Sequence, residues 1–152
     1  MSDGKSLQKM QLEEIEAFQH ADDDYWYRPL VISENLFTYV AHVPPGGEMP
    51  AHEDAHEFDT SLYMLAGSLE ITFGEEQHVV DANAALYVPG GVPFGVRNDG
   101  EITASFVLTF HPPPDIESVE ALKETYEQKG REYKSPDEIN QIVGDTLNKC
   151  VC

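Results

Sequence analysis

The sequence predicts an all-β fold, a single small barrel with short helices near the N-terminus and the C-terminus. Between residues 31 and 111, short runs rich in Val, Ile, Phe, Tyr and Thr alternate with Pro, Gly, Asn and Asp, a pattern typical of a sandwich or barrel. No long helical stretch interrupts these runs, which argues against alternating strand–helix units. At 152 residues, the chain fits one domain with a buried core.

The chain divides into three segments within this one domain. Residues 1–30 are expected to form an N-terminal helix and arm, residues 31–111 the barrel, and residues 112–152 a helical extension. Within the arm, residues 20–30 are interpreted as an acidic loop that runs into aromatic residues. The expected strands lie within residues 35–43, 61–74, 77–82, 84–91, 93–100 and 103–111.

Three helices are expected outside the barrel. Apolar residues at helical spacing predict an amphipathic helix over residues 7–19 and another over residues 115–129, with Asp115 as its N-cap. A third is expected over residues 136–147, with Ser135 as its N-cap.

The charge of the chain excludes two classes of partner. Asp and Glu number 28 against 9 Lys and Arg, a formal net charge of −19. Such a surface repels nucleic acid phosphates and anionic lipids, so we expect no nucleic acid and no membrane partner. The first residues have no signal-peptide core, and no stretch approaches a membrane span. With Cys150 and Cys152 interpreted as reduced thiols, we expect a cytoplasmic protein.

A motif near residue 90 resembles one of the cupin superfamily, whose members are small jelly-roll barrels that often hold one metal ion. In cupins the second motif runs Gly, five residues, Pro-x-Gly, two residues, His, three residues, Asn. Pro89, Gly91 and Asn98 fall on those places. Asn83 stands for the first glycine, and asparagine can adopt the same left-handed conformation. The histidine place holds Phe94, which cannot bind a metal.

The first cupin motif is matched less regularly. It runs Gly, five residues, His-x-His, three or four residues, Glu, six residues, Gly. Counting forward from Gly46 puts His52 and Asp54 in the histidine places, whereas counting backward from Gly67 puts Asp54 and His56 there. The two counts differ by two residues, so the loop departs from the family pattern.

Two interpretations of this loop remain open. In the first, His52, Asp54 and His56 bind a divalent transition metal such as Fe, Mn or Zn, with Asp59 or His111 as the fourth ligand, because two imidazoles and a carboxylate suit such an ion. In the second, the loop is solvated charge beside an apolar, metal-free cavity.

Other side chains are expected to line the cavity or pack in the core, and Tyr63 is the candidate for moving protons. Arg28 is a candidate anchor for a substrate carboxylate, with a salt bridge as the alternative. The residues expected at the cavity or core are Tyr39, Tyr63, Met64, Tyr87, Phe94 and Val96.

The resemblance implies two classes of function. One is a metal-dependent oxygenase, isomerase or lyase acting on a small carbonyl or carboxylate compound. The other is a metal-free cupin that binds a small organic ligand in a binding or regulatory role. One-domain cupins commonly pair, so a homodimer is also expected.

Overall fold

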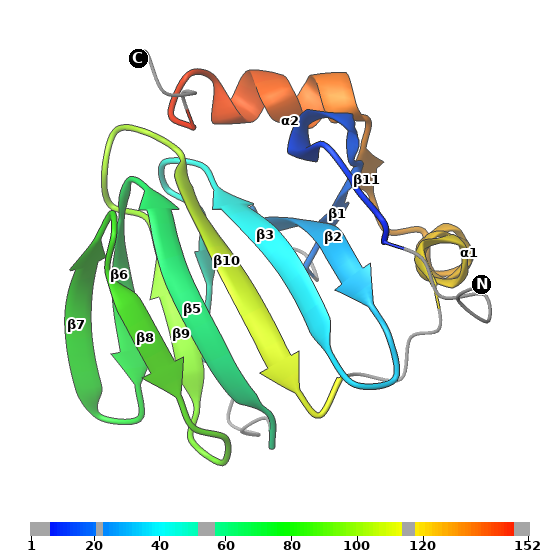
Figure 1. The fold of residues 1–152 in the computed structure, drawn as a ribbon. Coiled ribbons are helices and arrows are strands. Elements are labelled where there is room, and N and C mark those ends of the chain that lie inside the picture. The colour runs from blue at the N-terminus through cyan, green and yellow to red at the C-terminus, as the bar shows by residue number, and fades with distance from the viewer. Residues whose placement is uncertain (1–6, 21–22, 52–56, 114–117, 148–152) are drawn as a thin grey trace.

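Two β-sheets face each other and form the body of the protein (Figure 1). The computed structural model describes residues 7–20, 23–51, 57–113 and 118–147. The seven-stranded sheet has the order β11-β1-β2-β3-β10-β5-β8, and the four-stranded sheet has the order β4-β9-β6-β7. The strand pairs of the described residues are all antiparallel. The strands are β1 (Ala17–Gln19), β2 (Trp26–Ile32), β3 (Phe37–Val43), β4 (Glu48–Met49), β5 (Asp59–Ala66), β6 (Ser68–Phe73), β7 (Glu76–Asp81), β8 (Ala85–Val88), β9 (Phe94–Arg97), β10 (Ala104–His111) and β11 (Tyr133–Lys134).

The all-β fold and the six strand-bearing regions predicted between residues 35 and 111 are confirmed. The region 61–74 divides into β5 and β6 at Gly67, which has a φ of +77°. A Cβ added there would lie 2.8 Å from the Cα of Ala104. Only glycine combines this left-handed backbone with so close an approach.

The predicted helix over residues 7–19 is wrong. Leu12–Glu14 form only a short 3₁₀ turn, η1, and β1 follows it. Ala17 and Phe18 are fully buried, Ala17 in a cluster with α2 and Phe18 in the main core. Side chains that alternate between two faces require a strand, and pairing with β2 and β11 outweighs the local helical spacing. The sheet therefore begins well before residue 31.

The first of the C-terminal helices, α1 (Val119–Lys129), begins later than the sequence suggested. Its N-cap is Ser118, whose hydroxyl accepts a 3.1 Å hydrogen bond from the backbone N–H of Ala121. The predicted cap, Asp115, lies outside the described residues. Gly130, with a φ of +66°, ends the helix.

The second helix, α2 (Pro136–Val143), has the predicted Ser135 cap and is shorter than predicted. Ser135 and Glu138 form a capping box, in which each side chain accepts a hydrogen bond from the other residue's backbone N–H. Gly144 follows with a φ of +60° and ends the helix before residue 147.

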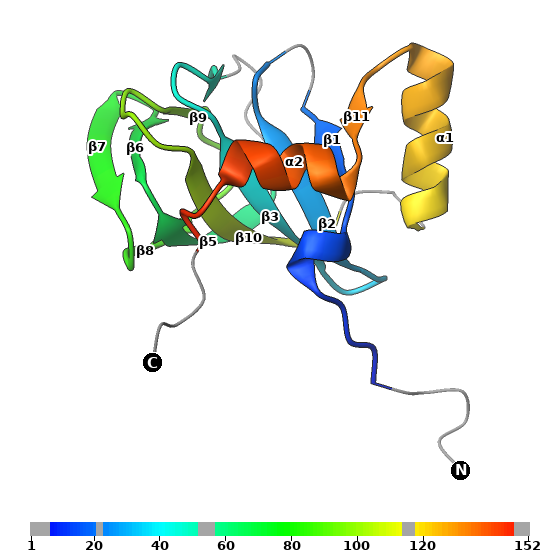
Figure 2. The same ribbon diagram turned by 90° about the horizontal axis from the view of Figure 1, so that it is seen from above.

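The main core lies between the two sheets. The helices cover the end of the larger sheet that β11, β1 and β2 form. Alternation in β5 is strict: Thr60, Leu62 and Met64 are buried, whereas Ser61, Tyr63 and Leu65 are exposed. From α1, Leu122 and Tyr126 join the main core. A second cluster joins α2 to the other face of β1 and β2 through Ala17, Trp26, Ile139 and Val143 (Figure 2).

Arg28 lies under α2 and does not reach the cavity between the sheets. It is 1% exposed, and its Nη2 donates to the carbonyl of Pro136 at 3.2 Å and to Oδ1 of Asn140. Burial lowers its pKa to about 10, an effect that Glu13 partly opposes. The guanidinium therefore stays charged at neutral pH, and its role here is to hold α2 against the sheet.

No helix in the described part of the chain is both long and apolar enough to cross a membrane. Cys150 and Cys152 lie outside the described residues.

Candidate functional site

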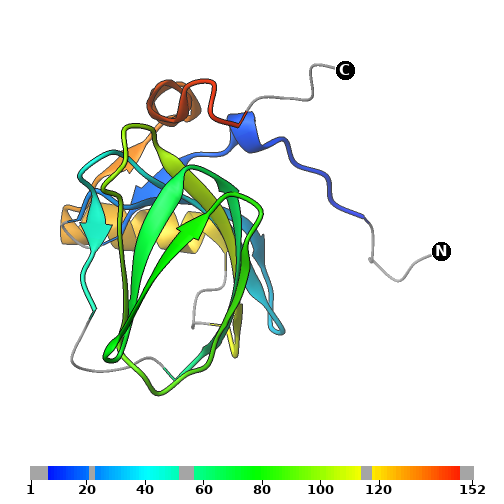
Figure 3. The same ribbon diagram turned by 90° about the vertical axis from the view of Figure 1, so that its left-hand side faces the viewer.

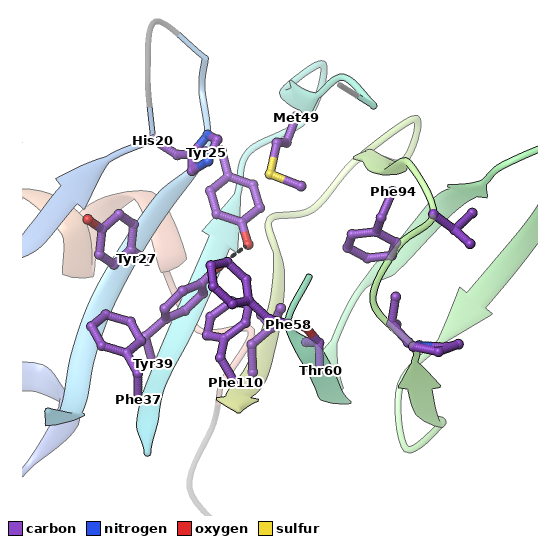
Figure 4. A pocket seen from close by; sticks show the side chains of 14 residues that line it. His20, Tyr25, Tyr27, Phe37, Tyr39, Met49, Phe58, Thr60, Phe94 and Phe110 are labelled. Atoms are coloured by element: carbon purple, nitrogen blue, oxygen red, sulfur yellow. Dashed lines mark hydrogen bonds between the residues drawn. The ribbon is translucent and has the colours of Figure 1, made fainter. Parts of the chain in front are cut away.

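A cavity of about 220 Å³ lies between the two sheets and is lined mainly by aromatic rings (Figure 4). Strands of both sheets supply it: β2 through Tyr27, β3 through Phe37 and Tyr39, β4 through Met49, β5 through Thr60, β8 through Val88, β9 through Phe94, and β10 through Leu108 and Phe110. The aromatic side chains around it are His20, Tyr25, Tyr27, Phe37, Tyr39, Phe58, Phe94 and Phe110.

Two tyrosine hydroxyls form the main polar group of the cavity. The hydroxyl oxygens of Tyr25 and Tyr39 lie 2.8 Å apart (Figure 4). Each hydroxyl has a single hydrogen, so their mutual bond uses one and leaves the other for an acceptor on a bound molecule. The pair therefore offers one hydrogen-bond donor among apolar walls.

Both hydroxyls stay neutral over the physiological range. Burial raises the pKa of Tyr25 and Tyr39 well above the ordinary tyrosine value of 10.0. The mutual hydrogen bond lowers the pKa of Tyr25 and raises that of Tyr39, both by less than burial. The pair acts as a donor and not as a phenolate base.

Tyr27 contributes its ring to the cavity while its hydroxyl turns away from it (Figure 4). Tyr126 of α1 donates to the carbonyl of Gln19, so the 3.0 Å bond between the Tyr27 and Tyr126 hydroxyls must take its hydrogen from Tyr27. This chain of hydroxyls fixes one wall of the cavity against α1.

The cavity suits an uncharged molecule. No Lys or Arg is found among the described residues that line it. Among the described lining residues, His20 alone could carry a positive charge, and burying a carboxylate without a counter-ion costs several kcal/mol. Of the carbonyl and carboxylate compounds that the sequence suggested, the cavity therefore favours neutral carbonyl or hydroxyl compounds.

The predicted metal ligands divide into two groups. His52, Asp54 and His56 lie outside the described residues, so their role stays a prediction. Asp59 and His111 are brought together as opposite residues on β5 and β10. Both are exposed: Oδ1 of Asp59 accepts from the Gly90 N–H at 3.0 Å, and Nδ1 of His111 lies 3.4 Å from the carbonyl oxygen of Asn35.

The described residues do not themselves assemble a metal site. Within them, no group of three His, Cys, Asp or Glu side chains is placed to hold an ion. Phe94 and Thr60, which stand where the family motifs have a histidine and a glutamate, line the cavity with a ring and a hydroxyl. A metal site would therefore need at least one ligand from outside the described residues.

The expected placement of Tyr63 in the cavity is wrong. It is 42% exposed on the outer face of β5, and its hydroxyl donates to Oδ1 of Asn83 at 3.2 Å. Tyr87, also expected inside, is 69% exposed. Tyr39 and Phe94 line the cavity as expected, and Met64 and Val96 are buried in the core.

The sequence analysis missed several of the cavity residues. Tyr25 and Tyr27 lie in a segment that was interpreted as an acidic loop, although its aromatic residues were a signal. Phe37 and Phe110 alternate with polar residues in their strands, a pattern that marks one face. Phe58 directly follows a stretch rich in His and acidic residues, whose composition gave no signal of an apolar cavity wall.

The second motif forms the turn that its spacing predicted. Asn83 has a φ of +72°, as expected for a residue in the place of glycine. Asn98 is fully buried, and its side chain bonds three backbone groups: the carbonyls of Val43 and Ile102 and the N–H of Gly100, each at 2.8 Å. Asn98 therefore holds β3, β9 and the loop before β10 together.

Comparison with known proteins gives one family and many similar folds. Residues 39–110 match the model of the cupin domain. The chain is similar to an RmlC-like cupin from Shewanella frigidimarina, with 19% identity over 72% of this chain and 95% of that chain and a TM-score of 0.64. No curated protein sequence matches it.

Two further solved structures share the fold, and their names give them different activities. A polyketide cyclase, RemF, from Streptomyces resistomycificus has 19% identity over 79% of this chain and 93% of that chain, with a TM-score of 0.64. A predicted oxalate decarboxylase from Thermotoga maritima has 13% identity over 68% of this chain and 97% of that chain, with a TM-score of 0.61. At such identities these likenesses concern the fold alone.

Proposed function

The chain belongs to the cupin superfamily, and we propose that it binds a small, neutral aromatic compound with a hydroxyl or carbonyl oxygen in the cavity between its sheets. The observation that carries this proposal is the free hydroxyl hydrogen of the Tyr25–Tyr39 pair among aromatic side chains. An apolar pocket with a few convergent polar groups is the usual form of a small-molecule site.

The size of the cavity limits the ligand. An apolar cavity of about 150 Å³ holds benzene, and the cavity here measures about 220 Å³. One aromatic ring with a small substituent therefore fits. Its ring would pack against Phe58, Phe94 and Phe110, and its oxygen would accept from the tyrosine pair.

Calorimetric titration with phenol and toluene tests this proposal. Tyr25→Phe and Tyr39→Phe should each bind phenol nearly as well as the wild type, because the remaining hydroxyl keeps one hydrogen free. The double variant should bind phenol about tenfold more weakly, the loss of one hydrogen bond, and toluene with unchanged affinity. A wild type that binds neither compound, or a double variant that loses both equally, would contradict the proposal.

A second candidate function is a metal-dependent enzyme. Met49 and Phe58, which flank residues 52–56 in the sequence, line the cavity, and this supports a role for His52, Asp54 and His56 in holding an ion that acts on a bound ligand. Such an ion would supply Lewis-acid or oxygen-activating chemistry. Elemental analysis of protein purified without a histidine tag distinguishes the two functions, since a transition metal near one per chain favours the enzyme.

We also propose that the chain forms a homodimer through the outer face of β5, β8 and β10. Tyr63 is 42% and Leu65 is 36% exposed there. The described outward positions of this face carry one acidic residue, Asp59, at the end of β5 opposite His111, although the chain has a net charge of −19. The uncharged outward positions are Ser61, Tyr63, Leu65, Ala85, Tyr87, Val107 and Thr109. Two copies can approach through such a face with least repulsion.

Sedimentation at micromolar concentration tests the dimer. The wild type should sediment as a dimer, and Leu65→Asp should sediment as a monomer, because each copy would place a carboxylate in the shared apolar face. Val79→Asp, a change at an exposed residue on β7 outside this face, is the matched control and should remain a dimer. A monomeric wild type would refute the proposal.

A further inference from the structure

A second cavity lies between the sheets on the side of β7 and β8. It also measures about 220 Å³. Ile71 and Phe73 of β6 and Leu86 of β8 give it apolar walls. Glu76 and His78 of the edge strand β7 lie at its rim, with Oε1 and Nε2 3.3 Å apart. Figure 3 views the molecule from this side.

The two cavities share two residues, Val88 and Phe94. Val88 belongs to β8, where it pairs with Thr60, and Phe94 belongs to β9 of the opposite sheet, where it pairs with Phe73. The two shared side chains thus come from facing sheets and form the partition between the cavities. In Figure 4 the Phe94 ring lies across the first cavity from Tyr25 and Phe58.

The larger part of this partition is the Phe94 ring. The ring is partly buried and packs against the main core, and the structure around a truncated side chain of this kind relaxes only in part. Truncating it would leave one continuous space running from the tyrosine pair to the rim at β7.

We propose that Phe94 sets the length of the ligand: its ring restricts the wild-type site to one-ring compounds and closes off a second subsite that would otherwise accept a second ring. The proposal rests on the proposed function, since it assumes that the ligand oxygen lies at Tyr25 and Tyr39. The class of ligand that the second subsite would take is a linear two-ring phenol, with its far ring among Ile71, Phe73 and Leu86.

The test measures the affinities of phenol and 4-phenylphenol by calorimetric titration for the wild type and Phe94→Ala. The wild type should bind phenol and bind 4-phenylphenol poorly. Phe94→Ala should gain about 10- to 100-fold in affinity for 4-phenylphenol, the effect of burying one more phenyl ring. Its affinity for phenol should fall, because Phe94 is one of the rings against which the bound phenol packs.

Phe73→Ala is the matched control. It removes the same ring from the neighbouring strand and enlarges only the second cavity, because Phe73 does not line the first. Phe73→Ala should therefore show no gain in affinity for 4-phenylphenol. Thermal unfolding confirms that each variant is folded, and Phe94→Leu, which trims the partition less, should give an intermediate gain if Phe94→Ala does not fold.

The outcomes separate the two proposals. A wild type that binds phenol, with no selective gain for 4-phenylphenol in either Phe94 variant, overturns the role of Phe94 alone. An equal gain in affinity for 4-phenylphenol in Phe73→Ala also overturns the role of Phe94, because the gain would then not depend on the partition between the cavities. A wild type that fails to bind phenol, with a gain for 4-phenylphenol in Phe94→Ala, refutes the proposed function and supports the partition.

Discussion

Asn98→Ala is expected to lower the free energy of unfolding by about 2–4 kcal/mol, because it removes three hydrogen bonds and takes this partner from the buried carbonyl of Val43. The Asn98 side chain is fully buried. Its amide donates to the carbonyls of Val43 and Ile102, and its oxygen accepts from the N–H of Gly100, each at 2.8 Å. Alanine cannot form any of these three bonds, so each of the three backbone groups would lose its contact with residue 98.

Urea denaturation measures this change, and Asp99→Ala is its control. Asp99 is the next residue, and its ion pair with Arg97 at 3.0 Å is exposed to solvent. Exposed pairs contribute about 0–1 kcal/mol, so the control should remain within that range of the wild type. An Asn98→Ala variant as stable as the control would show that the motif asparagine does not hold this turn.

Raising the pH above about 10 is expected to destabilise the protein steeply. Burial raises the pKa of Tyr25, Tyr27 and Tyr39 above the ordinary value of 10.0. Above pH 10 the unfolded chain loses these phenolic protons while the folded chain keeps them. The folded state then binds more protons, so stability falls as the pH rises, by about 1.4 kcal/mol per pH unit for each tyrosine.

The three tyrosines together give a slope of about 4 kcal/mol per pH unit. Urea denaturation between pH 8 and pH 11 measures it. Stability should be unaffected by these groups below about pH 9, and Tyr27→Phe should reduce the slope above pH 10 by about a third. A wild-type stability that stays level from pH 9 to pH 11 would mean that these hydroxyls are not buried as the structure has them.

Local sequence signals predicted the parts of the fold that depend on local conformation. Asn83 adopts the left-handed turn because its short side chain tolerates it, and Ser135 caps α2 through a bond three residues away. In contrast, β1 and β2 depend on pairing with distant strands, β11 and β3. Nothing within residues 7–32 reveals those partners, so helical spacing and acidic composition were misleading there.

The candidate site was predictable only in part for the same reason. Strand alternation places Tyr63 and Leu62 on opposite faces, but only the pairing of β5 with β10 and β8 decides which face is inner. Motif spacing correctly placed Phe94 at the cavity. The Tyr25–Tyr39 pair joins residues fourteen positions apart, a contact that no local pattern indicates.

A crystal structure with 4-bromophenol tests the central claim most directly, because bromine is located by its anomalous scattering. The account predicts one bromine site in the cavity, near Phe58, Phe94 and Phe110, with the phenol oxygen within hydrogen-bond distance of the Tyr25 or Tyr39 hydroxyl. Bromine found only on the outer surface of the protein, with no compound between the sheets, would contradict it.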